Sequence, residues 1–246
     1  MSAAVSLLCL PCAGASATMY LRWRRLLPPW IEVLPVELPG RGVRLGEAFV
    51  TDFDDLVERL CAEQAGAMQR RFALFGHSMG ALIAWGIARR LRQTGGALPC
   101  ALVVSASAAP SRRDPARFDG LQGDQALIDD LRRQGGTPEE VFASPELLRL
   151  TLDVLGADYR LCAGFRHRHD APLPVPLHVL AGRDDDIPGD AVQGWSAEAS
   201  EPCTLDWFDG GHFFIRQQEQ VVLDVLARRL RPQGQGETSR ADRALA

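Results

Sequence analysis

Short apolar runs recur along the chain and alternate with longer stretches whose apolar residues repeat at helical spacing. The runs predict strands at residues 5–10, 31–36, 72–75, 101–105, 175–181 and 204–208. The helical spacing predicts helices at residues 18–27, 52–70, 81–90, 191–198 and 213–230, with Thr18 as the cap of the first. Strands that alternate with helices in this way predict an α/β protein with a mostly parallel sheet flanked by helices.

The alternation breaks between residues 110 and 174, where the pattern predicts helices at 124–134, 138–143 and 145–160 instead of strands. Apolar residues of the last stretch spread around the helix, so more than one of its faces needs covering. Because the break falls between two strands, we interpret it as a helical lid inserted over a site; the alternative is that these helices pack on the sheet. We expect one domain over residues 1–231 and a disordered tail at residues 232–246, which are polar and rich in small residues.

The predicted strand at residues 72–75 leads into Gly-His-Ser-Met-Gly at residues 76–80 and then into a helix. Gly-x-Ser-x-Gly between a strand and a helix is typical of a nucleophile elbow. Glycine at 76 and 80 removes side chains that would collide with the neighbouring strand and helix, so that the strained turn can expose the Ser78 hydroxyl. The alternative is a connecting turn without chemistry. The flanking strand and helix favour Ser78 as a nucleophile.

A serine hydroxyl needs a base to remove its proton and a third group to hold that base in one tautomer. His212 follows a predicted strand and two glycines, and it precedes the last helix. Catalytic groups gather at this end of the strands in open parallel sheets, so His212 is the predicted base. The other histidines are interpreted as an elbow residue that cannot turn onto the serine (His77), a core or interface histidine in a buried strand (His178) and two residues of an exposed basic segment (His167 and His169).

The acid of such a set follows a strand and comes between serine and histidine in chain order. Asp184, Asp185 and Asp186 follow the predicted strand at residues 175–181. Three adjacent carboxylates repel one another, so a run of this kind is ordinarily a solvated turn. Its position after a buried strand indicates that one of the three belongs to the site, and the pattern leaves open which one.

An oxyanion hole needs two backbone donors aimed at the developing negative charge. The amide of Met79 follows the serine directly and lies at a helix N-terminus, so it is the first predicted donor. Residues 11–17 form a loop of small residues after the first strand, where the backbone can approach a ligand closely. The amide of Ala13 in this loop is the second predicted donor.

Composition narrows the class of protein. The net charge of −4, with acidic residues interspersed among the arginines, gives no nucleic-acid footprint. The apolar runs are too short for a membrane span, and the absence of positive charge before Arg22 argues against a secretory signal. Six cysteines in 246 residues do not indicate a disulfide framework, and the redox-like spacing of Cys9 and Cys12 is interpreted as incidental. We expect a reduced cytoplasmic protein that uses no metal or other cofactor.

Several short motifs extend this picture from about residue 7 to residue 230. They are Leu-Pro-Cys-Ala-Gly-Ala-Ser at 10–16, Leu-Pro-Gly-Arg-Gly at 38–42, the elbow at 76–80, Gly-Gly-Thr-Pro at 135–138, Ala-Asp-Tyr-Arg at 157–160 and Gly-Gly-His-Phe-Phe at 210–214. Together they resemble the external (type II) thioesterases that accompany nonribosomal peptide and polyketide synthetases, which have the α/β-hydrolase fold. The first loop departs from that family's pattern, since Cys12 replaces an aromatic residue or histidine and Ala15 replaces a glycine. The departure leaves backbone donation intact and affects the fit of the acyl group.

The resemblance implies a catalytic triad of Ser78, His212 and Asp185, because Asp185 is the third residue after Gly182, as in the Gly-x-x-Asp loop of related hydrolases. It also implies hydrolysis of acyl thioesters from the phosphopantetheine arm of carrier proteins, as an editing step. Carrier proteins are typically acidic, so a set of arginines is expected to contact them, with plain solubility as the alternative: Arg112, Arg113, Arg166 and Arg168. We expect a monomer.

Other functions fit the same fold. One is a medium-chain acyl-carrier-protein thioesterase, an acyl-CoA thioesterase or a general esterase. Another is a catalytically inactive scaffold that only binds carrier proteins. The intact set of Ser78, Asp185 and His212 argues against the scaffold.

Overall fold

The computed structural model describes residues 5–121 and 123–231. Six parallel strands form one sheet in the order β2-β1-β3-β4-β5-β6. They are β1 (Val5–Leu10), β2 (Ile31–Pro35), β3 (Phe72–His77), β4 (Leu102–Ser105), β5 (Leu177–Gly182) and β6 (Cys203–Phe208). Because all of them run the same way, their carboxyl ends meet along one edge of the sheet, where ligands bind in open α/β sheets.

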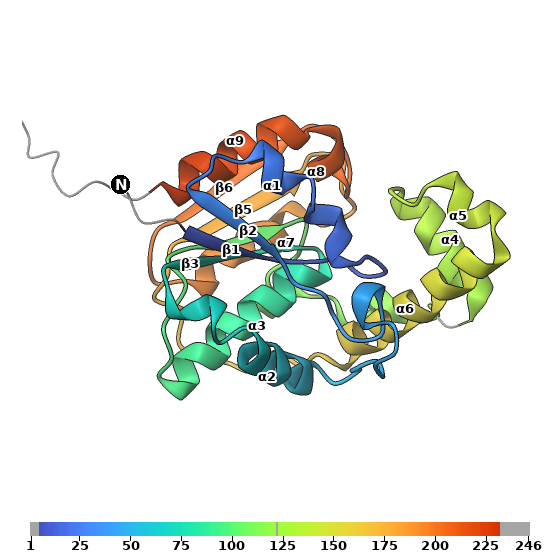
Figure 1. Ribbon diagram of the computed structural model, residues 1–246, viewed down its shortest axis with the longest axis horizontal. Helices are drawn as coiled ribbons and strands as arrows, with labels where there is room; N and C mark the ends of the chain where they lie inside the picture. The colour runs from blue at the N-terminus through green and yellow to red at the C-terminus, as the bar shows by residue number, and fades with distance from the viewer. Residues whose placement is uncertain (1–4, 122, 232–246) are drawn as a thin grey trace, which may run out of the picture.

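Helices cover both faces of the sheet (Figure 1). On one face lie α2 (Phe53–Glu63) and α3 (Met79–Thr94), and on the other lie α1 (Trp23–Leu26), α8 (Phe214–Gln217) and α9 (Glu219–Leu230). Consecutive strand residues alternate between the two cores: Leu74 belongs to the cluster under α2 and α3, and Phe75 to the cluster under α1 and α9. The inner strands are therefore apolar at nearly every position, which explains the continuous runs in the sequence.

Three helices follow β4 and precede β5: α4 (Asp124–Gln134), α5 (Glu139–Ala143) and α6 (Pro145–Gly164). We call them the helical insertion, and they extend to one side of the sheet (Figure 1). The insertion has its own apolar cluster of Leu127, Leu152, Leu155 and Tyr159. The bounds of all three helices agree with the sequence prediction to within a few residues. α7 (Gly189–Gln193) follows β5.

Four helix predictions are wrong in detail, and one of them, at residues 191–198, is divided between α7 and a 3₁₀ helix over Gly194–Glu198. Residues 18–27 form a 3₁₀ turn and the short α1, and Ser16 rather than Thr18 provides the cap, since its hydroxyl accepts a bond from the Thr18 amide. This segment is broken because Tyr20 and Trp23 pack edge-on against Phe75 under the sheet. The helix predicted at 52–70 ends at Glu63, and the one predicted at 213–230 is divided between α8 and α9.

The tail predicted to be disordered at residues 232–246 lies outside the described residues. In the part of the chain that the structure describes, none of the helices combines the length and the apolar character that crossing a membrane requires.

Candidate active site

Ser78 occupies a strained turn between β3 and α3. Its φ of +57° is unusual for a residue other than glycine. The Ser78 amide donates to the carbonyl of Ser105 over 2.7 Å, which ties the turn to the end of β4. The side chain makes no capping hydrogen bond to α3. The helix therefore leaves the Ser78 hydroxyl available for chemistry.

Two glycines make this turn possible. A Cβ atom at Gly76 would lie 2.0 Å from the carbonyl oxygen of Gly80, and one at Gly80 would lie 2.2 Å from the carbonyl oxygen of Leu10. Both obstacles are backbone atoms, which cannot rotate away as a flexible side chain does. The glycines thus allow β3, α3 and the end of β1 to meet, and this contact brings Ser78 beside the loop that follows β1.

His212 and Asp185 come from the loops after β6 and β5, which lie side by side. Main-chain hydrogen bonds hold the loops together: Arg183 N to Phe208 O at 2.9 Å and Asp184 N to Gly210 O at 3.0 Å. Nδ1 of His212 lies 3.0 Å from Oδ2 and 3.2 Å from Oδ1 of Asp185. A carboxylate that accepts from Nδ1 leaves Nε2 of the imidazole free to act as a base.

The structure distinguishes the three adjacent aspartates. The Asp185 side chain is 6% exposed and contacts His212. The Asp186 side chain is 76% exposed and instead forms an ion pair of 2.6 Å with Arg133 of α4. Asp184 is exposed. Of the three, Asp185 is the one placed to orient His212.

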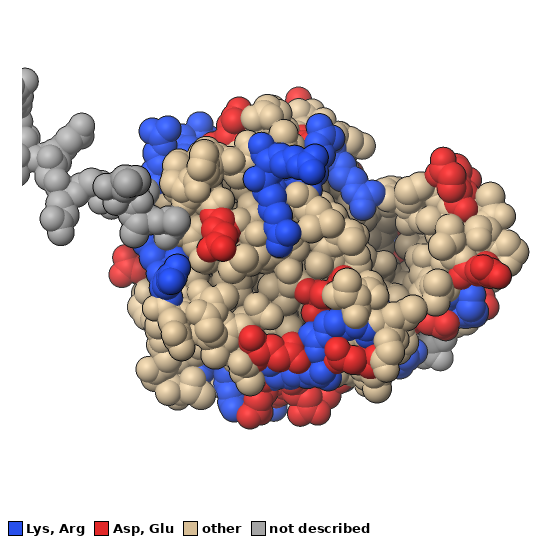
Figure 2. All heavy atoms as spheres, in the orientation of Figure 1, with Lys and Arg blue, Asp and Glu red and all other residues tan. Residues whose placement is uncertain are grey.

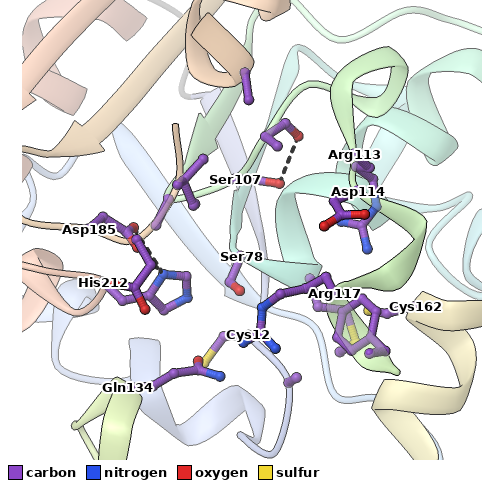
Figure 3. A pocket seen from close by; sticks show the side chains of 18 of the residues that line it. Cys12, Ser78, Ser107, Arg113, Asp114, Arg117, Gln134, Cys162, Asp185 and His212 are labelled. Atoms are coloured by element: carbon purple, nitrogen blue, oxygen red, sulfur yellow. Dashed lines mark hydrogen bonds and ion pairs between the residues drawn. The ribbon is translucent and has the colours of Figure 1, made fainter. Parts of the chain in front are cut away.

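The predicted site residues share one cavity of about 650 Å³, which is lined by Ser78, His212, Asp185, Met79 and Ala13 among others. Figure 2 shows a recess between the body of the molecule and the helical insertion. Figure 3 shows the Ser78 hydroxyl inside the cavity, with His212 and Asp185 on one side and Arg113, Arg117 and Cys162 on the other. The His212 side chain is hydrogen-bonded to Asp185 and not to Ser78. Catalytic hydrogen bonds of this kind often form only when substrate is bound.

Cys12 also lines the cavity, but it is a poor candidate nucleophile. Burial raises the pKa of its thiol to about 12, so the thiol is neutral at physiological pH. Cys9 is buried too, and burial raises the pKa of its thiol in the same direction. Both cysteines are free thiols. Serine chemistry is therefore favoured over thiol chemistry in this cavity.

His77 lies behind the elbow and does not reach into the cavity. Its buried ring places Nδ1 3.0 Å from the Ser105 hydroxyl, and its centre is 5.3 Å from that of His212. Burial, followed by the proximity of His212, lowers the pKa of His77 well below its usual value, so the ring that supports His212 is neutral. His178 is the satisfied core histidine that the sequence predicts, with Nδ1 2.8 Å from the Thr204 hydroxyl.

The four arginines expected at a partner surface lie in two places. Arg112 and Arg113 line the cavity. Arg168 instead pairs with Asp54 of α2 at 3.2 Å, and Arg166 donates to the carbonyls of Ala163 and Phe165. Sequence reasoning missed other arginines that face the cavity or join the insertion to the body, namely Arg117, Arg133 and Arg216.

A parallel sheet with a serine at a strained strand–helix turn and a histidine–aspartate pair at the ends of the last strands defines an enzyme of the α/β-hydrolase fold. The model of the thioesterase domain matches residues 5–233. The chain therefore belongs to the thioesterase family, and it is a hydrolase of the serine type.

Known proteins are similar to this chain over nearly its whole length. Thioesterase PikA5 of Streptomyces venezuelae is 39% identical over 227 residues, which cover 91% of this chain and 80% of that protein. The gramicidin S biosynthesis protein GrsT of Aneurinibacillus migulanus is 30% identical over 94% of this chain and 90% of its own length. The solved structure of the type II thioesterase BorB from the borrelidin biosynthetic cluster superposes with a TM-score of 0.85 at 39% identity, over 94% of each chain. The resemblance to type II thioesterases is confirmed.

Proposed function

We propose that this protein hydrolyses acyl thioesters from the phosphopantetheine arm of carrier proteins, and so removes misplaced acyl groups from a nonribosomal peptide or polyketide synthetase. The observation that carries the proposal is the single cavity that holds Ser78, the His212–Asp185 pair, and the backbone of Ala13 and Met79. The relatives support the pathway class, because PikA5 is named a thioesterase and GrsT a gramicidin S biosynthesis protein.

Acylation begins when Nε2 of His212 takes the proton of the Ser78 hydroxyl as its oxygen attacks the thioester carbonyl. The carbonyl oxygen becomes an oxyanion, which accepts hydrogen bonds from the amides of Met79 and Ala13. Met79 is the first residue of α3, where amides have no intrahelical acceptor, so its N–H is available. Asp185 holds the imidazole in the required tautomer and stabilises its charged form.

The tetrahedral intermediate collapses when the C–S bond breaks, and protonated His212 gives its proton to the departing phosphopantetheine thiol. The acyl group then remains as an ester on Ser78. Water, deprotonated by His212, attacks this ester, the same amides hold the second oxyanion, and the Ser78 oxygen leaves with the proton from His212. A thiolate is a better leaving group than an amide nitrogen, so the demand on His212 as an acid is modest.

The cavity offers room for both the acyl chain and the arm. Its walls combine apolar side chains, including Phe118, Leu121 and Phe213, with the guanidinium groups of Arg112 and Arg113. The apolar part suits an acyl chain. Exposed Arg112 suits the acidic surface or the phosphate of a loaded carrier protein.

Hydrolysis of a panel of acyl groups loaded on a carrier protein tests the proposal, with acyl-CoA and p-nitrophenyl esters measured in parallel. We expect the loaded carrier to be hydrolysed with the highest kcat/KM, and Ser78→Ala to abolish the reaction in every arm. A strong preference for simple esters would favour a general esterase. A wild-type protein that binds the carrier but forms no fluorophosphonate adduct on Ser78 would favour the scaffold.

A further inference from the structure

The motifs at residues 38–42 and 157–160 have no role in the chemistry above, and a buried ion pair joins them. Arg41 lies in the loop after β2, and Asp158 lies on α6 of the helical insertion. Both nitrogen–oxygen distances of the two-pronged contact are 2.6 Å, and the side chains are only 6% and 5% exposed. Paired guanidinium and carboxylate groups in this geometry are strongly directional.

The same two side chains hold the loop that carries Ala13. Oδ2 of Asp158 accepts a hydrogen bond of 2.8 Å from the Gly14 amide, and Arg41 donates one of 3.1 Å to the Ala15 carbonyl. Within the loop, Ala15 N donates to Cys12 O over 3.2 Å, so residues 12–15 form a tight turn. The φ of +76° at Gly14 is the value that the third position of a type II turn requires.

These bonds fix the orientation of the peptide groups on both sides of Gly14. Leu155 of α6 packs against Gly14: a Cβ atom placed on Gly14 would lie 3.2 Å from Cδ1 of Leu155. Asp158 and Leu155 contact the turn from α6, and Arg41 contacts it from the loop after β2. Ala13 of the same turn lines the cavity together with Ser78. The direction of the Ala13 amide is therefore set by a turn whose other contacts are made by Arg41 and Asp158.

Stability alone is a weak reason for such a pair. Buried ion pairs often contribute no more to folding than apolar side chains of the same volume. Here Nε of Arg41 is also buried without a hydrogen-bond partner among the described protein atoms. A pair that is costly to bury and still incompletely satisfied is better explained by the geometry that it enforces.

We infer that Arg41 and Asp158 are positioning residues for the oxyanion hole, and that the helical insertion takes part in catalysis through Asp158. The inference rests on the proposed function. When the pair is intact, the Gly14 amide is held by Asp158 and the Ala13 amide is aimed at the oxyanion. When it is broken, the turn relaxes and transition-state stabilisation falls, while substrate binding in the cavity is largely kept.

The test compares Asp158→Ala and Asp158→Asn with wild type on an acyl-carrier thioester, with active sites titrated by a fluorophosphonate. Affinity for a trifluoromethyl ketone analogue, whose Ser78 adduct places an oxyanion in the hole, is measured alongside. Asp158→Ala should lower kcat per active site and ketone affinity together by about 10- to 100-fold, with KM within about threefold. Asp158→Asn leaves one acceptor to serve both Gly14 and Arg41, and should lower both by about 2- to 10-fold.

Asp206→Asn is the matched control, because it breaks another arginine–carboxylate pair, with Arg229 at 2.9 Å, between β6 and α9. It should leave kcat and ketone affinity unchanged. Wild-type values of both quantities in the Asp158 variants, with only a lower Tm, would overturn the inference. Asp158→Asn decides the question if Asp158→Ala does not fold. A wild-type protein that neither hydrolyses the thioester nor forms the ketone adduct would instead overturn the proposed function.

Discussion

The sheet and the helical insertion hold their parts of the cavity by different means. β1, β3, β4 and β5 are buried at every position, and main-chain hydrogen bonds fix the loops that carry Ser78, Asp185 and His212. The outer part of the insertion contacts the body through exposed groups: Arg133 pairs with Asp186, and Arg216 donates to the carbonyl of Gly136. Exposed pairs of this kind contribute little each, so we expect the outer part of the insertion to be the less stable region.

This difference separates the tasks of the enzyme. The sheet positions the reacting groups, which tolerate almost no displacement. We expect the insertion to act as the lid that the sequence predicts, and to open for a carrier-bound arm at a small cost in free energy. The buried Arg41–Asp158 pair lies where the two regions join, so it belongs to the rigid part even though Asp158 is on α6.

The largest effect on activity is expected from substitution of Asp185, the acid that contacts His212. Asp185→Asn should lower kcat by about 10³- to 10⁴-fold, because the amide no longer fixes the tautomer of His212. Asp184→Asn should stay within a fewfold of wild type, since that side chain is exposed and the hydrogen bonds of the His212 ring go to Asp185. Steady-state kinetics on one acyl-carrier substrate checks both, and equal losses in the two variants would contradict the assignment of the acid.

The elbow tests the rigidity of the sheet region. Gly76→Ala places a methyl group against the backbone of Gly80, so we expect a loss of about 3–5 kcal/mol in the free energy of unfolding, with activity lost as well. Gly66→Ala is the control: Gly66 has φ of −62° and an open environment, and its substitution should be neutral or stabilising by up to about 1 kcal/mol. Urea unfolding measures both. An elbow that accepts alanine without loss would disprove the close approach of β3 and α3.

The sheet region should also carry a pH dependence that comes from a buried histidine of β5. Burial lowers the pKa of His178 to about 4, whereas the unfolded chain takes up this proton near pH 6.5. Acid therefore favours unfolding between these values, by up to about 1.4 kcal/mol per pH unit for this group. Unfolding free energies from pH 7 to 4.5 should fall less steeply in His178→Asn than in wild type. Identical slopes in the two proteins would refute the prediction.

The smallest effect is expected at the outer contact of the insertion. Asp186→Ala removes the exposed pair with Arg133 and should cost less than about 1 kcal/mol of stability. We expect kcat to stay near wild type and hydrogen exchange in α4 to quicken. Unchanged exchange in α4 would show that this pair does not hold the insertion.

The elbow was predictable from sequence because its constraint is local: two glycines and a serine meet a strand and a helix within a few residues. The choice among Asp184, Asp185 and Asp186 was not fixed by the residues themselves, because it depends on how two loops from different strands pair. The resemblance pointed to Asp185, and the structure shows why that carboxylate reaches His212.

Long-range packing accounts for what sequence reasoning missed. The helix expected at residues 18–27 is broken because Tyr20 and Trp23 pack on Phe75, more than 40 residues away. Arg41 and Asp158 are separated by 117 positions, so spacing gave no sign that they pair. Their presence in two otherwise unexplained motifs was the available signal.

Trapping of the acyl-enzyme tests the central claim most directly. The protein is mixed with an acyl-carrier thioester, quenched in acid within the first turnovers, digested with trypsin and examined by mass spectrometry. The acyl mass is expected on Ser78 in the peptide of residues 72–89, and Ser78→Ala should carry none. Turnover by wild type with the acyl group on Cys12, or continued hydrolysis by Ser78→Ala, would contradict the account.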